Sequence, residues 1–239
     1  MCLIVARGHA GPTEPGFPFD AAWSHNSDGF GIAWSDGKKI FMHKTLKKHN
    51  AKRLLKLAMA APYPFIAHFR FRTRGLKTVA NVHPFRLGRH SAVMAHNGTL
   101  ETAEGPNGES DSVMFTRNVL SPLADVGGVK ALFDPKSKIA TMVSHITTGS
   151  RLALLRGNGD MIFYGAGWSS WRDLMCSNAY SLTAPVKYEA WPEADYAASG
   201  NVTPLKLLAK TLGAYSADSP AGTTAEDYEA WYTSPHRLH

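Results

Sequence analysis

Cysteine is scarce in this 239-residue sequence, and long apolar runs are absent. Cys2 and Cys176 are too few for a disulfide-stapled scaffold, and they do not have the spacing of a zinc site. No stretch approaches the roughly 20 apolar residues of a membrane helix. The first apolar run, residues 2–6, is also too short for a signal peptide. We therefore expect a soluble protein of the reducing cytoplasm, without a membrane partner.

Acidic residues are outnumbered, with 19 Asp and Glu against 26 Lys and Arg and a formal net charge of +7. Eight of the basic residues, and no acid, lie between Lys38 and Lys56. Such a stretch could contact nucleic acid or an acidic partner, but a solvated hairpin and helix face is the simpler interpretation. Nucleic acid is therefore a less favoured partner, because net charge describes association and solubility rather than fold.

Internal repeats, low-complexity tracts and the glycine motifs of nucleotide-binding folds are absent as well. Strand-like and helix-like patterns do not follow a strict βαβ alternation, which disfavours a Rossmann fold and predicts a mixed α+β chain. Turn residues at 35–38 and 157–160 predict two hairpins, and apolar spacing predicts helices over 50–60 and 112–120. Strands are expected over 3–6, 29–34, 39–43, 65–71, 91–96, 152–155, 161–164 and 174–177.

The composition changes after about residue 185, where proline, tryptophan and alanine gather before a tail rich in Ser, Thr and Pro. We expect one domain over residues 1–185 and a C-terminal extension over 186–239, which is helical near 203–212 or flexible. The extension has about 55 residues, fewer than the roughly 100–150 of a typical domain. It is too short for a synthetase domain.

The most reactive candidate is Cys2, because aminopeptidases remove an initial methionine that precedes a small residue. The freed α-amino group, with a pKa of roughly 7.7–8.0 in model peptides, could take the proton of the residue's own thiol. A thiol with a pKa of roughly 8.5 is already partly ionised near neutrality and is a good nucleophile. The alternative is that Cys2 is a small apolar residue that opens a strand.

A second candidate group follows the apolar segment 91–95, where His96 is succeeded by Asn97 and Gly98. A side-chain amide next to a backbone N–H with permissive geometry could bind the oxyanion of a tetrahedral intermediate. The alternative is an ordinary Asn-Gly turn, which is common.

Charged candidates lie in two further segments. Alternation along a strand would place Arg70, Arg72 and Arg74 on one side, so that at least one could bind a carboxylate bidentately. The alternative is a solvated strand face. Asp111 could receive a substrate ammonium, or Ser110 or Asp111 could cap the helix that begins there. The histidines have no HExxH or similar paired spacing, so we expect no metal and no cofactor.

Six motifs occur in order along the chain: Met1-Cys2, Asp28-Gly29-Phe30-Gly31, His68-Phe69-Arg70, Asn81-Val82-His83-Pro84-Phe85, His96-Asn97-Gly98 and Ser110-Asp111-Ser112. Together they resemble class II glutamine amidotransferase domains, which are N-terminal nucleophile (Ntn) hydrolases, and above all small stand-alone members from bacteria and phages. The resemblance covers residues 2 to about 182, with a late block at Ser177-Asn178. It implies the four-layer αββα sandwich of Ntn hydrolases, with Cys2 at the start of a central strand.

The resemblance also implies roles for individual residues. Cys2 matches the family's nucleophile, and Asn97 and Gly98 match the pair that binds the oxyanion. Arg70 matches the arginine that holds the α-carboxylate of glutamine, and Asp111 matches the acid that holds its α-ammonium. These assignments agree with the chemistry of a free amino acid, which carries one charge of each sign and needs one cation and one anion held apart.

Two further residues, Thr73 and His83, match a threonine and a supporting histidine of the family's glutamine pocket. Two positions depart from the family's pattern. Phe71 stands where several members have tryptophan, and Arg74 stands where the synthases have histidine. Arg74 also occurs in the stand-alone group, so it bears on the subgroup and not on the family.

The activity implied by the resemblance is hydrolysis of the side-chain amide of L-glutamine through a γ-glutamyl thioester on Cys2, with the ammonia delivered to a separate acceptor enzyme. Two alternatives stay open. One is hydrolysis of another γ-glutamyl amide, for which the same glutamyl-binding residues would serve. The other is a binding module without activity, and the joint presence of nucleophile, oxyanion and charged candidates argues against it.

Overall fold

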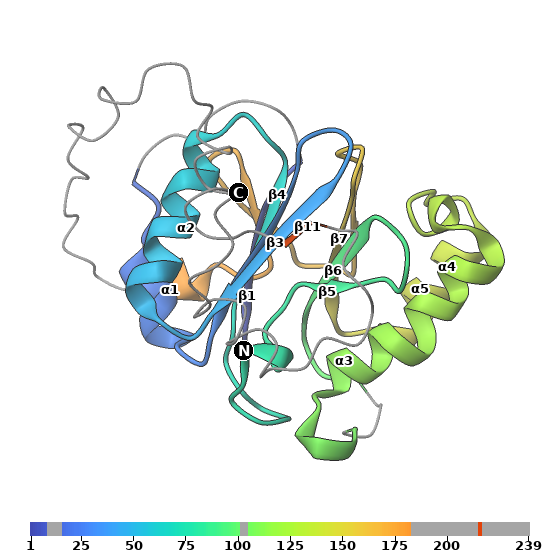
Figure 1. Ribbon diagram of the computed structural model, residues 1–239, viewed down its shortest axis with the longest axis horizontal. Helices are drawn as coiled ribbons and strands as arrows, with labels where there is room; N and C mark the ends of the chain where they lie inside the picture. Colours follow the sequence, from blue (N-terminus) through green and yellow to red (C-terminus); the bar gives the residue numbers. More distant parts are fainter. Residues whose placement is uncertain (9–15, 101–104, 183–214, 217–239) are drawn as a thin grey trace, which may run out of the picture.

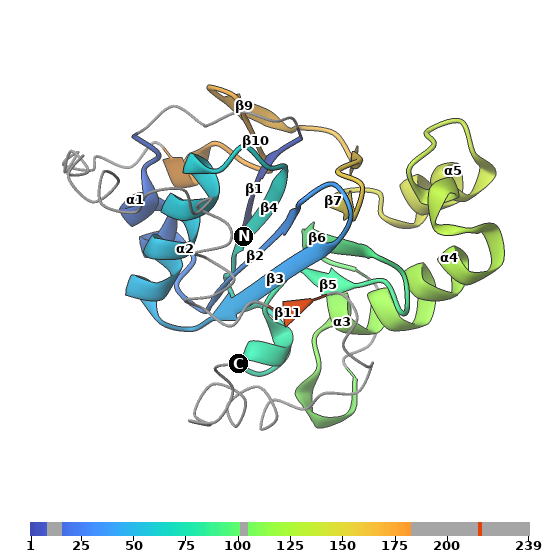
Figure 2. The ribbon, with the colours of Figure 1, turned by 45° about the horizontal axis from the view of Figure 1, so that its top comes forward.

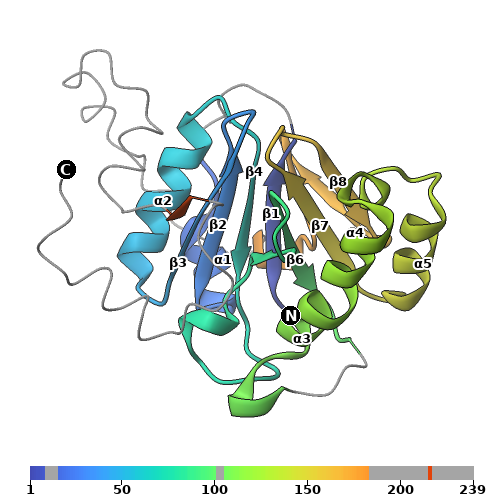
Figure 3. The same ribbon diagram turned by 45° about the vertical axis from the view of Figure 1, so that its right-hand side comes forward.

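The computed structural model describes residues 1–8, 16–100, 105–182 and 215–216 (Figure 1). Two antiparallel sheets pack face to face, and helices cover the outer face of each sheet (Figure 3). The expected α+β fold with four αββα layers is therefore confirmed.

The first sheet has the strand order β11-β3-β2-β4-β1-β10-β9 (Figure 2), with β1 at Leu3–Arg7, β2 at Phe30–Ser35, β3 at Ile40–Thr45, β4 at Phe65–Phe69, β9 at Ser169–Trp171, β10 at Leu174–Cys176 and β11 at Tyr215–Ser216. The strand that follows Cys2, β1, is paired on both sides, with β4 and with β10. All five of its residues are buried, which explains the continuous apolar run over 3–6.

The second sheet has the order β5-β6-β7-β8, with β5 at Phe85–Arg86, β6 at Ala92–Asn97, β7 at Arg151–Arg156 and β8 at Met161–Tyr164. Apolar side chains of both sheets fill the layer between them. Ile4 and Ala6 of β1 belong to one buried cluster with Val93 and Ala95 of β6. The alternation of the inward residues along each strand fixes which face of each sheet is turned to the other.

Helices on the two outer faces bury separate apolar clusters. α1 (Phe19–His25) and α2 (Lys48–Ala60) lie on the first sheet, and Leu54, Leu55 and Ala58 of α2 belong to its outer cluster. Their i, i+1, i+4 spacing is that of an amphipathic helix. The second sheet is covered by α3 (Asp111–Phe115), the π-helical turn η3 (Thr116–Leu120), α4 (Ser121–Gly127) and α5 (Lys138–Ile146).

Among the described residues, no helix is long and apolar enough to cross a membrane. The extension expected over 186–239 lies outside the described residues except for β11, and so does the helix expected near 203–212. Short 3₁₀ turns are present at Val79–Asn81, Pro106–Gly108, Val129–Leu132 and Tyr180–Leu182.

Most of the predicted elements are present, with ends within two residues of the prediction. The helix expected over 112–120 runs as α3 and η3, and its N-cap is Ser110, whose Oγ accepts a hydrogen bond from the N–H of Val113 at 3.4 Å. Asp111, the alternative cap, is the first residue of the helix. The sequence patterns did not predict α1, α4 and α5, because helices of seven to nine residues have too few turns for a clear periodicity.

The strand expected over 65–71 ends at Phe69, and the placement of the three arginines of 70–74 on one strand face is wrong. The neighbouring strands decide this end. Leu3 of β1 and Phe30 of β2 both pair with Phe69, and both strands begin there. After Phe69 the main chain of Arg70 still bonds with Gly29 and Asp28, and the chain beyond it forms a loop.

The basic stretch over 38–56 forms the β2–β3 turn, β3 and most of α2. Lys48 and Lys52 of α2 make ion pairs with Asp20 of α1, each with an N–O distance of 2.8 Å. Part of the positive charge is therefore balanced within the protein, which supports the solvated-face interpretation of this stretch.

The far end of β1 is anchored by Arg7, whose side chain is fully buried. Its guanidinium donates hydrogen bonds to the carbonyls of Ala58, Met59, Ala61 and Tyr63, at and beyond the end of α2. The last carbonyls of a helix have no partner within the helix. Arg7 supplies the missing donors and thereby ties β1 to α2.

We expect Arg7→Met to lower the free energy of unfolding by about 3 kcal/mol, because several buried carbonyls would lose their donors at once. Urea denaturation at neutral pH measures the loss. Arg89→Met is the control, since the Arg89 side chain is 80% exposed and pairs with the surface carboxylate of Asp125; it should cost less than about 1 kcal/mol. Equal costs for the two variants would contradict the anchoring role.

Candidate active site

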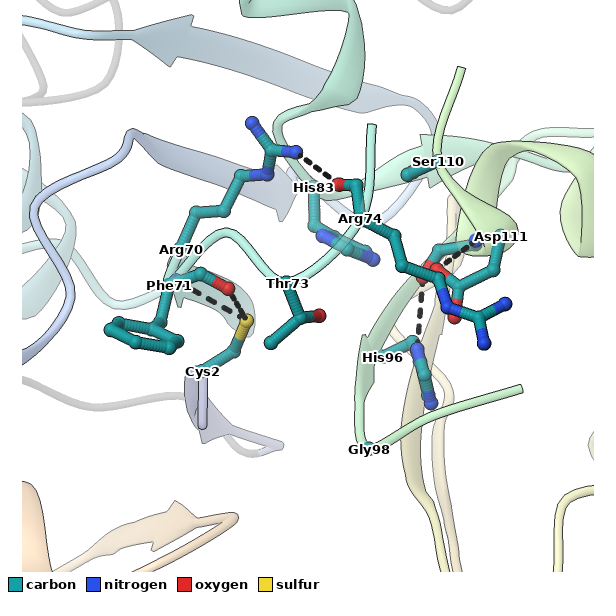
Figure 4. A pocket seen from close by; sticks show the side chains of 11 residues that line it. Cys2, Arg70, Phe71, Thr73, Arg74, His83, His96, Gly98, Ser110 and Asp111 are labelled. Atoms are coloured by element: carbon teal, nitrogen blue, oxygen red, sulfur yellow. Dashed lines mark hydrogen bonds between the residues drawn. The ribbon is translucent and has the colours of Figure 1, made fainter. Parts of the chain in front are cut away.

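A cavity that is open to solvent lies where Cys2 precedes β1, Arg70 follows β4 and Gly98 follows β6 (Figure 4). The residues that line it are Cys2, Arg70, Phe71, Thr73, Arg74, His83, His96, Gly98, Ser110, Asp111 and Ser112.

Cys2 is half-buried at the cavity wall, and its sulfur contacts the main chain of Phe71 (Figure 4). Sγ lies 3.3 Å from both the N–H and the carbonyl oxygen of Phe71. The sheet register creates this contact, because Leu3 pairs with Phe69 and Cys2 therefore lies beside the chain just after β4. The carbonyl of Cys2 in turn accepts a hydrogen bond of 2.7 Å from Nδ2 of Asn178.

The pKa of the Cys2 thiol is raised above its ordinary value, mainly because burial penalises the thiolate. Four groups act in the opposite direction and favour the thiolate: the N–H of Phe71, the N-terminal amino group, the guanidinium of Arg70 and the N–H of Cys2 itself. The sulfur therefore has partners for its ionised form but needs a base to ionise at neutral pH.

Arg70 is buried, and its guanidinium organises the loop that follows it. It donates to the carbonyls of Leu76 and Arg74, each at 2.9 Å, and Figure 4 shows the bond to Arg74. A guanidinium has five N–H donors, so these two bonds leave capacity for a carboxylate in the cavity. Burial lowers the pKa of Arg70, and the negative groups nearby, Cys2 and Asp28 among them, partly offset this effect.

Two buried or half-buried side chains brace the same loop. Asp28 accepts a hydrogen bond from the N–H of Arg72 at 2.9 Å and pairs with Lys77 at 2.9 Å. Asn81 donates to the carbonyls of Leu76 and Gly108. It also accepts from the N–H of Ser110, and so joins the loop to the start of α3.

Asp111 is buried at the first position of α3, on the cavity wall. Its Oδ1 accepts hydrogen bonds from the N–H and the hydroxyl of Ser112, at 2.7 and 3.2 Å. Its Oδ2 accepts from the N–H of Leu100 at 3.2 Å. These donors hold a carboxylate at the cavity wall, where it could meet an ammonium group.

Gly98 must be glycine for two reasons. Its φ of +150° lies in a region that side chains disfavour, and a Cβ atom there would lie 2.9 Å from the Cα of Ser150. The crowding keeps the backbone of Gly98 at the cavity wall, where its N–H is the candidate oxyanion donor.

Asn97, the last residue of β6, is buried but is not among the residues that line the cavity. Its Nδ2 donates to the hydroxyl of Ser177 at 2.8 Å. Its Oδ1 is buried and has no hydrogen-bond partner among the described residues. The structure therefore brings six of the seven predicted site residues to the cavity wall and leaves Asn97 behind it.

Neutral histidines back the cavity. The ring of His83 lies 4.1 Å from that of His68 and 4.4 Å from that of Phe85, measured between centroids. Burial lowers the pKa of His68 to about 3, that of His96 to about 4 and that of His83 well below its ordinary value. Both ring nitrogens of His83 lack a partner within the described part of the chain. A polar group in the cavity could satisfy them.

Sequence reasoning missed the lining role of Ser110 and Ser112 and the bracing role of Asn81. The first two were interpreted as the start of a helix, which they also are. Their position beside a cavity depends on where that helix lies on the sheet, and the local sequence carries no signal for it. Within the described ranges, no group of three or more His, Cys, Asp or Glu side chains is placed to hold a metal ion.

The model of the family described as "Glutamine amidotransferases class-II" matches residues 1–177 of the chain. This match covers most of the sequence and every residue of the cavity wall. The chain belongs to the class II glutamine amidotransferases. No curated protein matches it.

Three solved structures are similar to this class II amidotransferase chain, all at low identity. The glutamine phosphoribosylpyrophosphate amidotransferase from B. subtilis, complexed with ADP and GMP, has 16% identity and a TM-score of 0.44, and the match covers 76% of this chain and 42% of that one. A class-II domain protein from Silicibacter pomeroyi, titled as a glutamine aminotransferase, has 16% identity, a TM-score of 0.37 and coverages of 66% and 73%. The structure titled as the allosteric regulatory enzyme of purine biosynthesis has 17% identity and a TM-score of 0.38, and the match covers 66% of this chain and 36% of that one. The family assignment rests on the family model alone.

The buried histidines predict how the stability of this amidotransferase depends on pH. His43, His68 and His96 have folded-state pKa values of about 4, 3 and 4, below the ordinary value of 6.5. Their contribution to the free energy of unfolding is therefore complete above pH 6.5. It is lost as the pH falls toward 4, because the histidines of the unfolded chain take up protons at a higher pH than those of the folded chain. Between pH 6.5 and about 4, each histidine adds about 1.4 kcal/mol per pH unit to the slope of the free energy of unfolding against pH.

Urea denaturation at pH 7.5, 6.5, 5.5 and 4.5 measures this slope. His43→Gln should reduce this slope by the contribution of one proton, about 1.4 kcal/mol per pH unit. His49→Gln, which removes an exposed imidazole from α2, is the matched control and should change it less. A free energy of unfolding that rises on acidification would contradict the neutral state of these rings.

Proposed function

We propose that the chain hydrolyses the side-chain amide of L-glutamine, with Cys2 as an N-terminal nucleophile after loss of Met1, and that the ammonia passes to a separate acceptor enzyme. One observation carries the proposal: the Cys2 thiol, the Arg70 guanidinium and the Asp111 carboxylate line one small cavity. Membership of the class II glutamine amidotransferases supports the same activity.

Substrate recognition follows from charge. The α-carboxylate of glutamine binds the remaining N–H groups of Arg70, and the α-ammonium binds Asp111. Thr73 and His83, which line the same cavity, complete the pocket around the glutamyl chain. The side-chain amide then lies over Cys2.

The chemistry proceeds by acyl transfer to sulfur. The α-amine of Cys2 takes the thiol proton, and the thiolate attacks the amide carbon. The N–H of Gly98, at the cavity wall, stabilises the oxyanion, and Asn97, the residue before it and behind that wall, contributes the second hydrogen on its Nδ2. The tetrahedral intermediate collapses, the amine gives its proton to the leaving nitrogen, and ammonia departs. Water then hydrolyses the γ-glutamyl thioester to glutamate and restores the thiol.

Removal of Met1 acts directly on the nucleophile. Burial raises the pKa of the Cys2 thiol, and the N-terminal amino group is one of the groups that lower it. After processing, that amino group is carried by Cys2 itself and lies closer to the sulfur. Its charge then favours the thiolate more strongly, because the interaction grows as the distance shrinks.

A second candidate is hydrolysis of a γ-glutamyl amide whose leaving group carries a carboxylate. Arg74 supports it, because this residue adds a second guanidinium to the cavity lining. Such a substrate would use the same nucleophile and the same glutamyl contacts.

The function is tested by ammonia or amine release from a panel of glutamine and γ-glutamyl amino acids. We expect turnover of glutamine by the purified chain and none by Cys2→Ala, and intact mass should show that the active protein lacks Met1. Faster cleavage of a γ-glutamyl amino acid than of glutamine would favour the second candidate. Full activity with Met1 retained would refute the role of the free amine.

The separate acceptor enzyme is tested by adding proteins co-purified from the native host. A rate of glutamine hydrolysis that rises on their addition supports it.

Variants of the site residues should affect either KM or kcat, according to the role of each residue. Asp111→Asn and Arg70→Lys should mainly raise KM, because their contacts with the α-groups are present in ground and transition states alike. Asn97→Ala should mainly lower kcat, by about 10²–10³, which is the loss seen for an oxyanion donor in a comparable hydrolase. Steady-state kinetics with glutamine measures both constants. A change in KM alone for Asn97→Ala would show that the oxyanion assignment is wrong.

A further inference from the structure

The hydrogen-bond pattern between β1 and β10 changes near Cys2, at the pair of Ile4 and Ser177. Val5 pairs with Cys176, so the next pair toward the N-terminus is Ile4 with Ser177. The N–H of Ser177 donates to the carbonyl of Ile4 at 3.0 Å, as in a regular antiparallel pair. The return bond is different, because the N–H of Ile4 donates to the side-chain oxygen of Ser177 at 2.8 Å. A hydroxyl therefore takes the place of a main-chain carbonyl.

The same hydroxyl reaches the second sheet. Oγ of Ser177 also accepts the hydrogen bond from Nδ2 of Asn97, at 2.8 Å. Ile4 and Ser177 are 0% exposed and Asn97 is 1% exposed, so solvent cannot replace these bonds. One buried oxygen thus connects the strand of the candidate nucleophile with the side chain of the candidate oxyanion donor.

The next residue fixes the nucleophile itself. Nδ2 of Asn178 donates to the carbonyl of Cys2 at 2.7 Å. Two consecutive side chains after β10 therefore hold two groups that must act together on one substrate carbon.

We propose that Ser177 is a positioning residue for the reaction, acting through the side-chain amide of Asn97. The proposal rests on the proposed function, which assigns the oxyanion to Asn97 and Gly98. Ser177 does not line the cavity and touches no reacting atom. Its part is to fix the rotation of the Asn97 amide relative to Cys2.

The donor and acceptor sites of a hydroxyl group suit Ser177 to this positioning role. A serine hydroxyl offers two acceptor sites and one donor. Both acceptor sites are taken, by the N–H of Ile4 and by Nδ2 of Asn97. Oδ1 of Asn97 has no partner among the described residues. Within the part of the chain that the structure describes, Ser177 is therefore the side chain that holds the Asn97 amide.

The chain offers a matched control four residues further on. The hydroxyl of Ser181 also accepts a hydrogen bond from an asparagine, Nδ2 of Asn26, at 3.2 Å. Ser181 is 0% exposed, like Ser177. A merely structural role predicts similar effects for alanine at the two serines, whereas the positioning role predicts an effect on turnover at Ser177 alone.

The kinetic test compares Ser177→Ala, Ser181→Ala, Asn97→Ala and the double variant at Ser177 and Asn97. Ser177→Ala should lower kcat for glutamine about 10- to 100-fold, a part of the full loss of an oxyanion donor, with KM changed less than about twofold. Ser181→Ala should leave both constants within about twofold. In the Asn97→Ala background, Ser177→Ala should have no further effect on kcat, because a residue that acts through another loses its influence when the other is gone. Additive losses, or an equal loss at Ser181, would overturn the proposal.

A second readout does not need turnover. The side-chain NH₂ signals of Asn97 in an ¹⁵N spectrum are assigned by their absence in Asn97→Ala. Ser177→Ala should shift them and speed their exchange with water, whereas Ser181→Ala should leave them in place. Unmoved signals in Ser177→Ala would refute the anchoring. If the unaltered chain cleaves no glutamine, the proposed function fails, and moved signals still support the anchoring of Asn97. Ser177→Cys, of similar size but with a weak acceptor, gives the same comparison if the alanine variant does not fold.

Discussion

The pairing of Leu3 with Phe69 is the constraint on which the site depends. Phe30 pairs with Phe69 as well, so β1, β2 and β4 reach their ends at one level. The main chain released after β4 then lies beside Cys2, and the N–H and carbonyl of Phe71 face its sulfur. Arg70 follows β4 directly and uses its guanidinium to shape the loop that bounds the cavity. A register shift of one residue would turn every side chain of β1 to the opposite face.

Charged and neutral side chains share the cavity wall. Among the lining residues, Arg70, Arg74 and Asp111 carry charge, whereas burial holds His83 and His96 in their neutral forms. Neutral imidazoles can offer hydrogen bonds without competing for the α-groups of an amino acid. The charge on the cavity wall therefore lies on guanidinium and carboxylate side chains.

The sequence allowed most of the fold and much of the site to be predicted, for local reasons. Apolar runs and turn residues predict β1, the two hairpins and α2, and the ordered motifs predict six residues of the cavity wall. The rest depends on contacts between distant residues. Asn97 and Ser177 are 80 positions apart, and Cys2 and Asn178 are 176 apart, so no local pattern could predict their hydrogen bonds. The strand end at Phe69 was missed because neighbouring strands set it.

The central place of β1 has a consequence for synthesis of the chain. Its second neighbour, β10, begins at Leu174, so β1 cannot complete its pairing until the ribosome has made most of the domain. At about 5–20 residues per second, the delay between the two strands is roughly 9–34 s. During that interval the Met1–Cys2 peptide bond is accessible to an aminopeptidase. Any removal of Met1 can thus precede the folding that buries Cys2 against Phe71.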